Sequence, residues 1–169
     1  MATAAATSRC VGPLQLTGAG RLTAERPARA TPRLRVFAAE LTVQVSHALG
    51  RDGICVIEAR GPFGYSPPLH VHGREDEVFY MLEGELTIRV GAAERRLAAG
   101  QAALAPIGVP HTFRVDSPAG ARWLNITTHG DFERFVLAVA GATKHRRAAT
   151  LAELGREERI EFVGPPLTS

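Results

Sequence analysis

The chain has very little cysteine. Its 169 residues include only Cys10 and Cys55, which form no C-x-x-C pair. Two such residues do not make a disulfide framework, so the fold must depend on a hydrophobic core. Cys55 lies in an apolar stretch and is expected to be a small buried side chain. This sparse use of cysteine is typical of a reducing compartment, and we expect the protein to be cytoplasmic.

Long hydrophobic runs are also missing. No stretch approaches the ~20 apolar residues that a membrane span needs, so no membrane association is expected. No apolar segment follows a basic start, which argues against a secretory signal. Residues 1–35 are rich in Ala, Thr, Arg and Pro, and their one acid is Glu25. This composition weakly imitates an organellar transit peptide, but an arm that is flexible or pairs with a sheet edge is the favoured interpretation.

A strong charge of one sign is absent from the body of the chain. The net charge is +3, but residues 1–40 hold six Arg against Glu25 and Glu40, which gives +4. The remaining 129 residues therefore carry −1. No basic stripe interleaved with aromatic residues is present either, so nucleic acid is not an expected partner.

What the chain does have is apolar content of 45%, with 17 Gly and 11 Pro, which suits many short strands joined by turns. Alternating or apolar runs follow one another with little room for helices between them. This spacing predicts an all-β sandwich or barrel. The expected strands are 41–45, 53–59, 69–72, 77–82, 86–90, 102–105, 111–115 and 122–128.

The pattern changes after residue 130. Asp131 is a good N-cap for a helix that would run through Val139 and end at Gly141. Thr150-Leu151-Ala152-Glu153 has the form of a capping box, which predicts a second helix to about Arg159. We therefore expect an arm at 1–35, a β-barrel at 36–130 and a helical extension at 131–169.

Two glycine- and proline-punctuated segments carry the chemistry. The first, from Gly64 to Gly84, reads G-x5-H-x-H-x4-E-x6-G, and the second, from Gly100 to His111, reads G-x5-P-x-G-x2-H. In an extended strand, a His-x-His pair points both imidazoles to one face. A Glu beyond a short turn can return to that face, and a distant His completes the set. The candidate metal ligands are His70, His72, Glu77 and His111.

Three neutral imidazoles and one carboxylate suit a divalent transition metal rather than calcium or magnesium. We expect one such ion per chain. Iron is placed first, and nickel, manganese, cobalt, copper and zinc are all compatible with the donor set.

These two segments resemble the conserved motifs of the cupin superfamily. The first matches at every position, and the second departs only at its end, where Val115 replaces an Asn that is not a ligand in the family. The resemblance covers roughly residues 36–167. It implies a double-stranded β-helix, or jelly-roll barrel, here with two short C-terminal helices. The run from Arg74 to Glu85 further resembles the bacterial group similar to quercetin 2,3-dioxygenase.

Side-chain alternation identifies residues expected to line the barrel around the metal. If Glu77 and His111 face inward, so do their neighbours two positions away, and a later strand adds another face. Plain core packing is the alternative for each. An apolar pocket of this kind suits a small apolar or aromatic substrate. The candidate substrate-binding residues are Phe79, Met81, Ile88, Phe113, Val115, Trp123 and Asn125.

Proton transfer needs a positioned acid or base. The resemblance to quercetinase-like enzymes implies that Glu77 is both a ligand and a candidate base. Tyr80 and His129 are further catalytic candidates, with purely structural roles as the alternative. Glu75 and Asp76 are expected either to face solvent or to orient the ligand histidines.

Three function classes remain open at this point. The first is a metal-dependent dioxygenase or oxygenase that acts, with O2, on an enolic, phenolic or polyketide-like molecule. The second is a non-oxidative polyketide cyclase or isomerase that uses the metal as a Lewis acid. The third is a small-molecule-binding protein without catalysis, which the intact ligand set argues against.

A homodimer is also expected. An antiparallel sandwich leaves sheet edges that need cover. The stretch 34–37 has the pattern of a strand that could cover such an edge. The resemblance to the cupin superfamily also implies pairing of this kind, which is common among its small members.

Overall fold

The computed structural model describes residues 14–16, 22–24, 33–49, 53–145 and 150–168. The chain divides into two compact units, residues 1–31 and 32–169. The described part of the first unit is a short antiparallel hairpin of β1 (Leu14–Leu16) and β2 (Leu22–Ala24). The rest of the predicted arm up to residue 31, including Cys10, lies outside the described residues.

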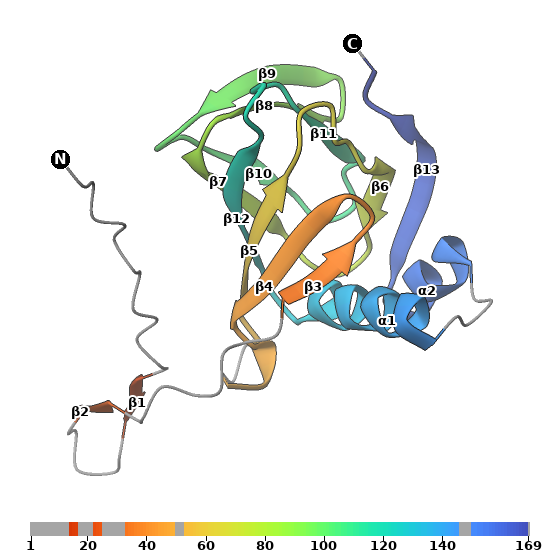
Figure 1. Cartoon of the computed structure of the whole chain (residues 1–169). Helices are drawn as coiled ribbons and strands as arrows, with labels where there is room; N and C mark the ends of the chain where they lie inside the picture. The colour runs from red at the N-terminus through yellow and green to blue at the C-terminus, as the bar shows by residue number, and fades with distance from the viewer. Residues whose placement is uncertain (1–13, 17–21, 25–32, 50–52, 146–149, 169) are drawn as a thin grey trace, which may run out of the picture. The chain divides into compact units, whose positions relative to one another are not determined.

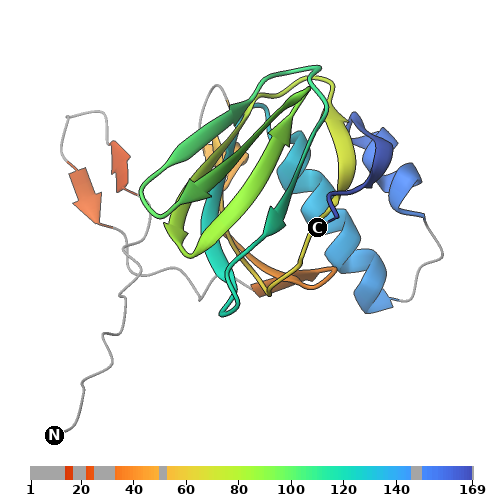
Figure 2. The ribbon, with the colours of Figure 1, turned by 90° about the horizontal axis from the view of Figure 1, so that it is seen from above.

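The second unit contains two antiparallel sheets that pack face to face, which confirms the predicted all-β cupin-type sandwich (Figures 1 and 2). One sheet has the order β10-β7-β12-β5-β4-β3, and the other has the order β13-β6-β11-β8-β9. The first sheet comprises β3 (Arg33–Val36), β4 (Ala39–Val45), β5 (Cys55–Gly61), β7 (Glu77–Glu83), β10 (Ala102–Ala105) and β12 (Ala121–Thr127). The second comprises β6 (Pro68–His72), β8 (Glu85–Val90), β9 (Ala93–Ala98), β11 (His111–Val115) and β13 (Ile160–Pro166).

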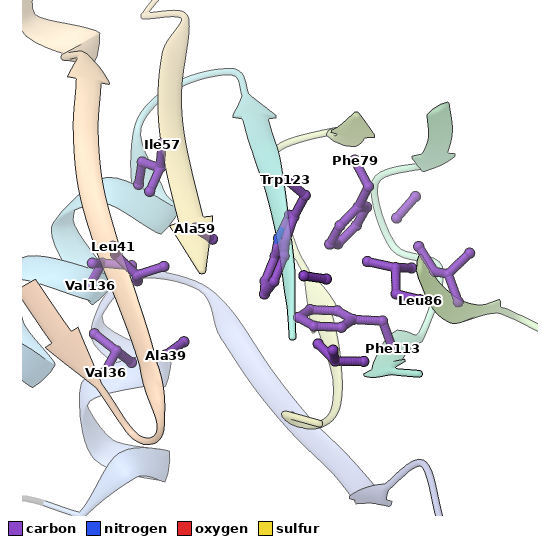
Figure 3. Packing of buried hydrophobic residues seen from close by; sticks show 14 of the residues in the cluster. Val36, Ala39, Leu41, Ile57, Ala59, Phe79, Leu86, Phe113, Trp123 and Val136 are labelled. Atoms are coloured by element: carbon purple, nitrogen blue, oxygen red, sulfur yellow. The ribbon is translucent and has the colours of Figure 1, made fainter. Parts of the chain in front are cut away.

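The core forms because strands of both sheets alternate between buried and more exposed residues. Every residue of β12 from Ala121 to Thr127 follows this alternation, and Trp123 is 1% exposed. Its ring meets Phe113 of the opposite sheet edge-on, with 5.1 Å between ring centroids. Figure 3 shows these two rings close to Phe79 and Leu86 in the middle of the sandwich. Each fully buried large side chain of this kind stabilises the fold by about 1.5–3 kcal/mol.

The β7–β8 turn has its position fixed by a glycine. Gly84 has φ 74°, a conformation that side chains with a Cβ rarely adopt. An added Cβ would also lie 2.6 Å from the carbonyl oxygen of Gly120. This turn joins one sheet to the other, so β7 and β8 can face each other across the core.

Every strand expected from the sequence is present, with ends shifted by at most two residues. The strand-like stretch 34–37 corresponds to β3, which crosses the boundary between the predicted arm and the predicted barrel. Two strands of this unit were not expected from the sequence: β9 is mostly exposed, and β13 lies within the predicted helical extension. The 3-10 helix η1 (His47–Leu49) follows β4.

Two short helices cover one side of the sandwich, as predicted. The helix α1 (Asp131–His145) begins at the expected residue but continues through Gly141 rather than ending there. The helix α2 (Leu151–Glu157) starts with the expected capping box, in which Thr150 and Glu153 exchange hydrogen bonds. In Figure 1, α1 lies beside the β3–β4 hairpin, and α2 lies next to β13.

Among the residues that the structure describes, no helix is long and apolar enough to cross a membrane.

Candidate metal centre

The four predicted ligands come from three strands of two sheets. His70 and His72 lie on β6, and His111 lies on the neighbouring strand β11, where it is paired directly with His70. Glu77 begins β7 in the opposite sheet. The His-x-His alternation therefore puts both β6 imidazoles into the sandwich, where strand pairing adds His111 and sheet packing adds Glu77.

The candidate ligand atoms of these four residues all lie within 4.8 Å of one another, and all four residues are buried. The Nε2 atom of His111 lies 3.0 Å from Oε2 of Glu77, and Nε2 of His72 lies 3.5 Å from the same oxygen. The donor set and its closeness are compatible with a divalent metal ion, as the sequence predicts.

Hydrogen bonds fix the orientation of two of the rings. Nδ1 of His70 donates to the carbonyl oxygen of Pro68 at 2.8 Å, and Nδ1 of His111 donates to the carbonyl oxygen of Val109 at 3.0 Å. A ring that donates from Nδ1 leaves Nε2 as its free lone pair. Both rings thus present Nε2 for coordination.

His72 follows the same rule with a different acceptor. Its Nδ1 donates to Oε1 of Glu75 at 2.8 Å. Its Nε2 is buried and has no hydrogen-bond partner among the described residues. Buried polar atoms in native proteins are usually paired, so an unpaired Nε2 facing Glu77 fits a position where a metal ion binds.

The electrostatics of the cluster also suit a metal. Burial, together with the neighbouring His111 and His72, lowers the pKa of His70 to about 3, so its imidazole is neutral at neutral pH. Burial alone would raise the pKa of Glu77, but hydrogen bonding to His111 and the positive charge of nearby histidines in their protonated forms outweigh it and lower the pKa to about 2. A neutral imidazole and an ionised carboxylate are the forms that coordinate metals.

The pKa of His72 is shifted in the opposite direction. Burial lowers it, but the hydrogen bond to Glu75 and the carboxylates of Glu77 and Asp131 outweigh burial and raise it. A proton and a metal ion therefore compete for this nitrogen.

One cavity opens beside the cluster and has a volume of about 60 Å³. Its wall is largely apolar and aromatic, and it is contributed by both sheets, by the β3–β4 hairpin and by α1. The lining residues are Val36, Phe37, Ala39, Leu41, Tyr65, Pro67, His70, His72, Glu77, Phe79, Phe113, Trp123, Asn125, Phe132, Phe135, Val136, Ile160 and Phe162.

The structure brings part of the predicted substrate-binding set to this cavity. Phe79, Phe113, Trp123 and Asn125 line it. Asn125 Nδ2 also donates a hydrogen bond to Oε1 of Glu77, so this residue holds the candidate ligand.

The other three predicted lining residues face inward but do not reach the cavity. Met81, Ile88 and Val115 are at most 1% exposed and belong to the hydrophobic core. Alternation identified the correct face of each strand, but it carries no information on depth along the barrel.

The two further catalytic candidates do not line the cavity either. Tyr80 lies between the inward-facing Phe79 and Met81 on β7, so its side chain points to the outer face of the sheet, where it is 39% exposed. His129 is exposed in the turn before α1, where its Nδ1 contacts the hydroxyl of Thr128. We therefore assign neither residue to the chemistry of the site.

Several cavity residues were not recognised in the sequence. Phe132 and Phe135 come from α1, Phe162 from β13 and Phe37 from the β3–β4 turn. None lies in either metal-binding motif. The one available signal is that aromatic residues make up only 6% of the chain, yet several of them occur in these terminal segments.

Residues 59–127, which hold all four ligands, match the family described as Cupin domain. Over this segment the chain is similar to a cupin domain. The match agrees with the motif resemblance and with the two-sheet architecture around the ligands. A comparison with curated proteins finds no match.

Solved cupin structures share the fold. The Cnp3 cupin domain of Schizosaccharomyces pombe is 12% identical, with a TM-score of 0.56 over 83% of this chain and 95% of that one. A predicted oxalate decarboxylase from Thermotoga maritima is 21% identical, with a TM-score of 0.51 over 53% and 79% of the two chains. An RmlC-like cupin from Shewanella frigidimarina NCIMB 400 is 20% identical, with a TM-score of 0.51 over 60% and 88%. At these identities the likeness supports the cupin fold and nothing finer.

Proposed function

We propose that the protein is a metal-dependent cupin enzyme, specifically a dioxygenase that acts on a compact enolic or phenolic molecule. The observation that carries this proposal is the His70, His72, Glu77 and His111 cluster, which lies buried against an apolar cavity. A binding protein without catalysis would not need four buried donors that converge on one point. The similarity of residues 74–85 to the quercetinase-like group gives further support.

A metal held by these four residues would act as a Lewis acid on an enolate and, if it is iron, copper, nickel or cobalt, would open a route to reaction with O2. Glu77 has two separate roles available. Its Oε2 faces His72 and His111, and its Oε1 accepts a hydrogen bond from Asn125. Glu77 is ionised at neutral pH, and we assign to it the enol or phenol proton of a bound substrate.

The cavity favours a compact substrate. Its volume of about 60 Å³ is below the ~150 Å³ of an engineered cavity that binds benzene. A three-ring flavonol does not fit without movement of the wall, whereas a small enol or a single substituted ring needs much less. Trp123 adds one polar group, because its buried Nε1 has no hydrogen-bond partner within the described part of the chain. This N–H is a candidate donor to a substrate oxygen.

Dioxygenation needs no further reactant. Both atoms of O2 enter the product, and the carbon–carbon double bond of the enol or phenol that breaks into two carbonyl groups supplies the four electrons that O2 accepts. The proton on Glu77 returns to a product oxygen.

The second candidate is a cyclase or isomerase. Its reaction would use the same proton transfer to Glu77 but would return the proton to carbon and leave O2 unchanged. The apolar cavity and the polarising metal site favour it over a storage or scaffold role.

The test is turnover with one metal loaded at a time, on a panel of small enols, β-diketones, catechols and flavonols. For a dioxygenase we expect O2 consumption that matches product formation, and two labelled oxygen atoms in the product when 18O2 is used. Product formation under nitrogen, with solvent deuterium incorporated at carbon, would instead establish the cyclase or isomerase.

The control is the double variant His70→Ala/His72→Ala, which removes two of the four donors. It should bind no metal at concentrations that load the wild type, and it should show no turnover. A double variant that retains one metal per chain would disprove the assigned site.

A further inference from the structure

Glu75 is a buried carboxylate that belongs to neither sheet. It lies in the turn between β6 and β7 and is 1% exposed. Its Oε1 accepts hydrogen bonds from Nδ1 of His72 at 2.8 Å and from the backbone N–H of Phe132 at 2.7 Å. Its Oε2 accepts from the backbone N–H of Asp131 at 3.1 Å. One side chain therefore joins a candidate ligand to the first residues of α1.

His72 differs from the other two histidines in how its ring is held. The rings of His70 and His111 donate to backbone carbonyls two residues away on the chain, which the strand itself fixes. The ring of His72 donates to the side chain of Glu75. Its orientation therefore depends on a residue that can be substituted without altering the backbone of the ligand strand.

The contact of Glu75 with α1 also satisfies backbone N–H groups at the start of the helix. The first N–H groups of an α-helix have no partner within the helix, and a carboxylate is favoured there because the helix dipole is positive at this end. Glu75 satisfies two of these groups from outside the helix. The preceding residue Arg74 also pairs with the side chain of Asp131 at 2.6 Å. The β6–β7 turn and the start of α1 thus form one hydrogen-bonded unit.

The same part of α1 forms a wall of the cavity. Phe132 lies with its ring centroid 5.7 Å from that of His72, and Phe132, Phe135 and Val136 all line the cavity. A displacement of α1 would therefore alter both the hydrogen bonding of Glu75 and the space available to a substrate.

We propose that Glu75 is a positioning residue that locks the His72 ring with Nε2 toward the metal and makes the start of α1 a structural part of the metal centre. The inference rests on the metal site of the proposed function. Its consequence is that metal loading tightens the wall that faces the substrate, because the ion, His72, Glu75 and the first amides of α1 are connected in series.

The first experiment compares metal affinity for the wild type and Glu75→Gln. Gln keeps the size of the side chain but loses its charge and offers one acceptor oxygen in place of two, so it cannot serve all three donors. Loss of such a partner of a ligand histidine typically weakens metal binding 10–100-fold, and we expect this loss in Co2+ titrations against a chelator. The visible spectrum of the bound Co2+ should also change, which a role in helix capping alone would not cause.

Two variants serve as controls. Glu153→Gln makes the same chemical change at the start of α2, where Glu153 caps the backbone N–H of Thr150 and touches no ligand. Glu158→Gln removes an ion pair with Arg134 of α1 and contacts neither His72 nor Glu75. Both should bind Co2+ within twofold of the wild type with an unchanged spectrum. If Glu75→Gln behaves as they do, Glu75 does not position His72.

The second experiment needs no variant. In hydrogen exchange of the wild-type protein, a peptide spanning residues 130–136 should exchange more slowly when metal is added, whereas a peptide spanning α2 should not change. Unchanged exchange at the start of α1 in protein shown to be loaded would overturn the proposed connection. Failure of the wild type to bind any metal would overturn the proposed function itself, so the two failures are distinguishable.

Discussion

At the scale of single residues, Glu77 combines the most functions. It is the one candidate ligand from the six-stranded sheet, and its two oxygens have different surroundings. Asn125 is distant from Glu77 in sequence, but its strand β12 pairs with β7. Its side chain donates a hydrogen bond to Oε1 of Glu77 and keeps this oxygen in place. This division makes it possible to separate a ligand role from a role as base.

We predict that Glu77→Gln separates these roles. Gln retains the shape and can coordinate through its carbonyl oxygen, but it cannot accept a proton at neutral pH. If Glu77 is also the base, the variant reloaded with metal should lose about 10²–10⁴-fold in turnover per bound metal. The measurement is the rate divided by metal content, for wild type and variant, with the substrate that the panel identifies. Equal turnover per metal would leave Glu77 as a ligand only.

The sequence alone identifies site residues whose position follows from local spacing. His70 and His72 share a face because strand side chains alternate, and the same rule places Asn125 inward. Tyr80 could have been removed from the candidates by this rule, since it alternates with Phe79. The sequence left Glu75 open between facing solvent and orienting a ligand histidine. It could not decide, because the burial of Glu75 depends on amides of Asp131 and Phe132, more than fifty residues further along the chain.

At the scale of elements, a second buried carboxylate holds α1 to η1, the 3-10 helix that follows β4. Oε2 of Glu133 accepts a hydrogen bond from the backbone N–H of His47 at 2.8 Å and lies 2.7 Å from Nδ1 of the same residue. Burial raises the pKa of Glu133, but these hydrogen bonds outweigh burial and lower it below its usual value. The ionised form of Glu133 therefore stabilises the packing of η1 on α1.

We predict that Glu133→Gln lowers the free energy of unfolding at pH 7 by about 1.5–3 kcal/mol, the usual worth of hydrogen bonds to a charged group. A carboxyl with a lowered pKa stabilises the fold above its unfolded pKa, and the contribution is lost as pH falls through the folded pKa. The difference between wild type and variant should therefore shrink from pH 7 to pH 3. Urea unfolding at several pH values measures it, with the exposed Glu94→Gln as a control. A difference that does not depend on pH would contradict the assignment.

Elements were predictable where their partners are close in sequence or their signals are local. The capping box of Thr150 and Glu153 identifies the start of α2, and the turn at Gly84 identifies where β7 ends and β8 begins, although these strands belong to different sheets and form no hairpin. β13 was missed because it becomes a strand by pairing with β6, a partner some ninety residues earlier. The helix α1 continues through Gly141 because a glycine destabilises a helix by only about 1 kcal/mol, an amount that other interactions readily offset.

At the scale of the whole molecule, metal binding should contribute to stability without being required for folding. A ligand that binds only the folded state stabilises it by about 4 kcal/mol at a thousandfold excess over Kd. We predict that a chelator lowers the melting temperature of metal-loaded protein while circular dichroism at room temperature stays native. The reason is that the hydrophobic core, including Ile57, Phe79 and Leu86, does not depend on the ion. Complete unfolding by chelator at room temperature would instead indicate a structural metal site.

The outer face of the six-stranded sheet is apolar over four neighbouring strands. The apolar residues that alternate with the buried ones on these strands are Val56 on β5, Val78, Tyr80 and Leu82 on β7, Leu104 on β10, and Leu124 and Ile126 on β12. Glu58 and Arg60 of β5 and Arg122 of β12 share this face. Tyr80 and Leu104 are 39% and 51% exposed, respectively. Along the edge of this face lie charges of both signs, with Arg122 paired to Glu58 and Glu83. A contiguous apolar face with a rim of mixed charge suits contact with an identical copy of itself.

We propose that the predicted homodimer forms through this face. The sequence suggested that the 34–37 strand would cover a sheet edge. β3 (Arg33–Val36) pairs with β4 of its own chain and is itself an edge strand of the six-stranded sheet. We expect light scattering to give a dimer mass at micromolar concentration. Leu104→Glu should shift the protein to monomer, because a charge buried without a partner in an interface is costly. The matched control is Val163→Glu, which changes a residue of β13 that is 45% exposed on the other sheet and should leave the dimer intact. A monomeric wild type, or a dimer that Leu104→Glu leaves unchanged, would disprove this interface.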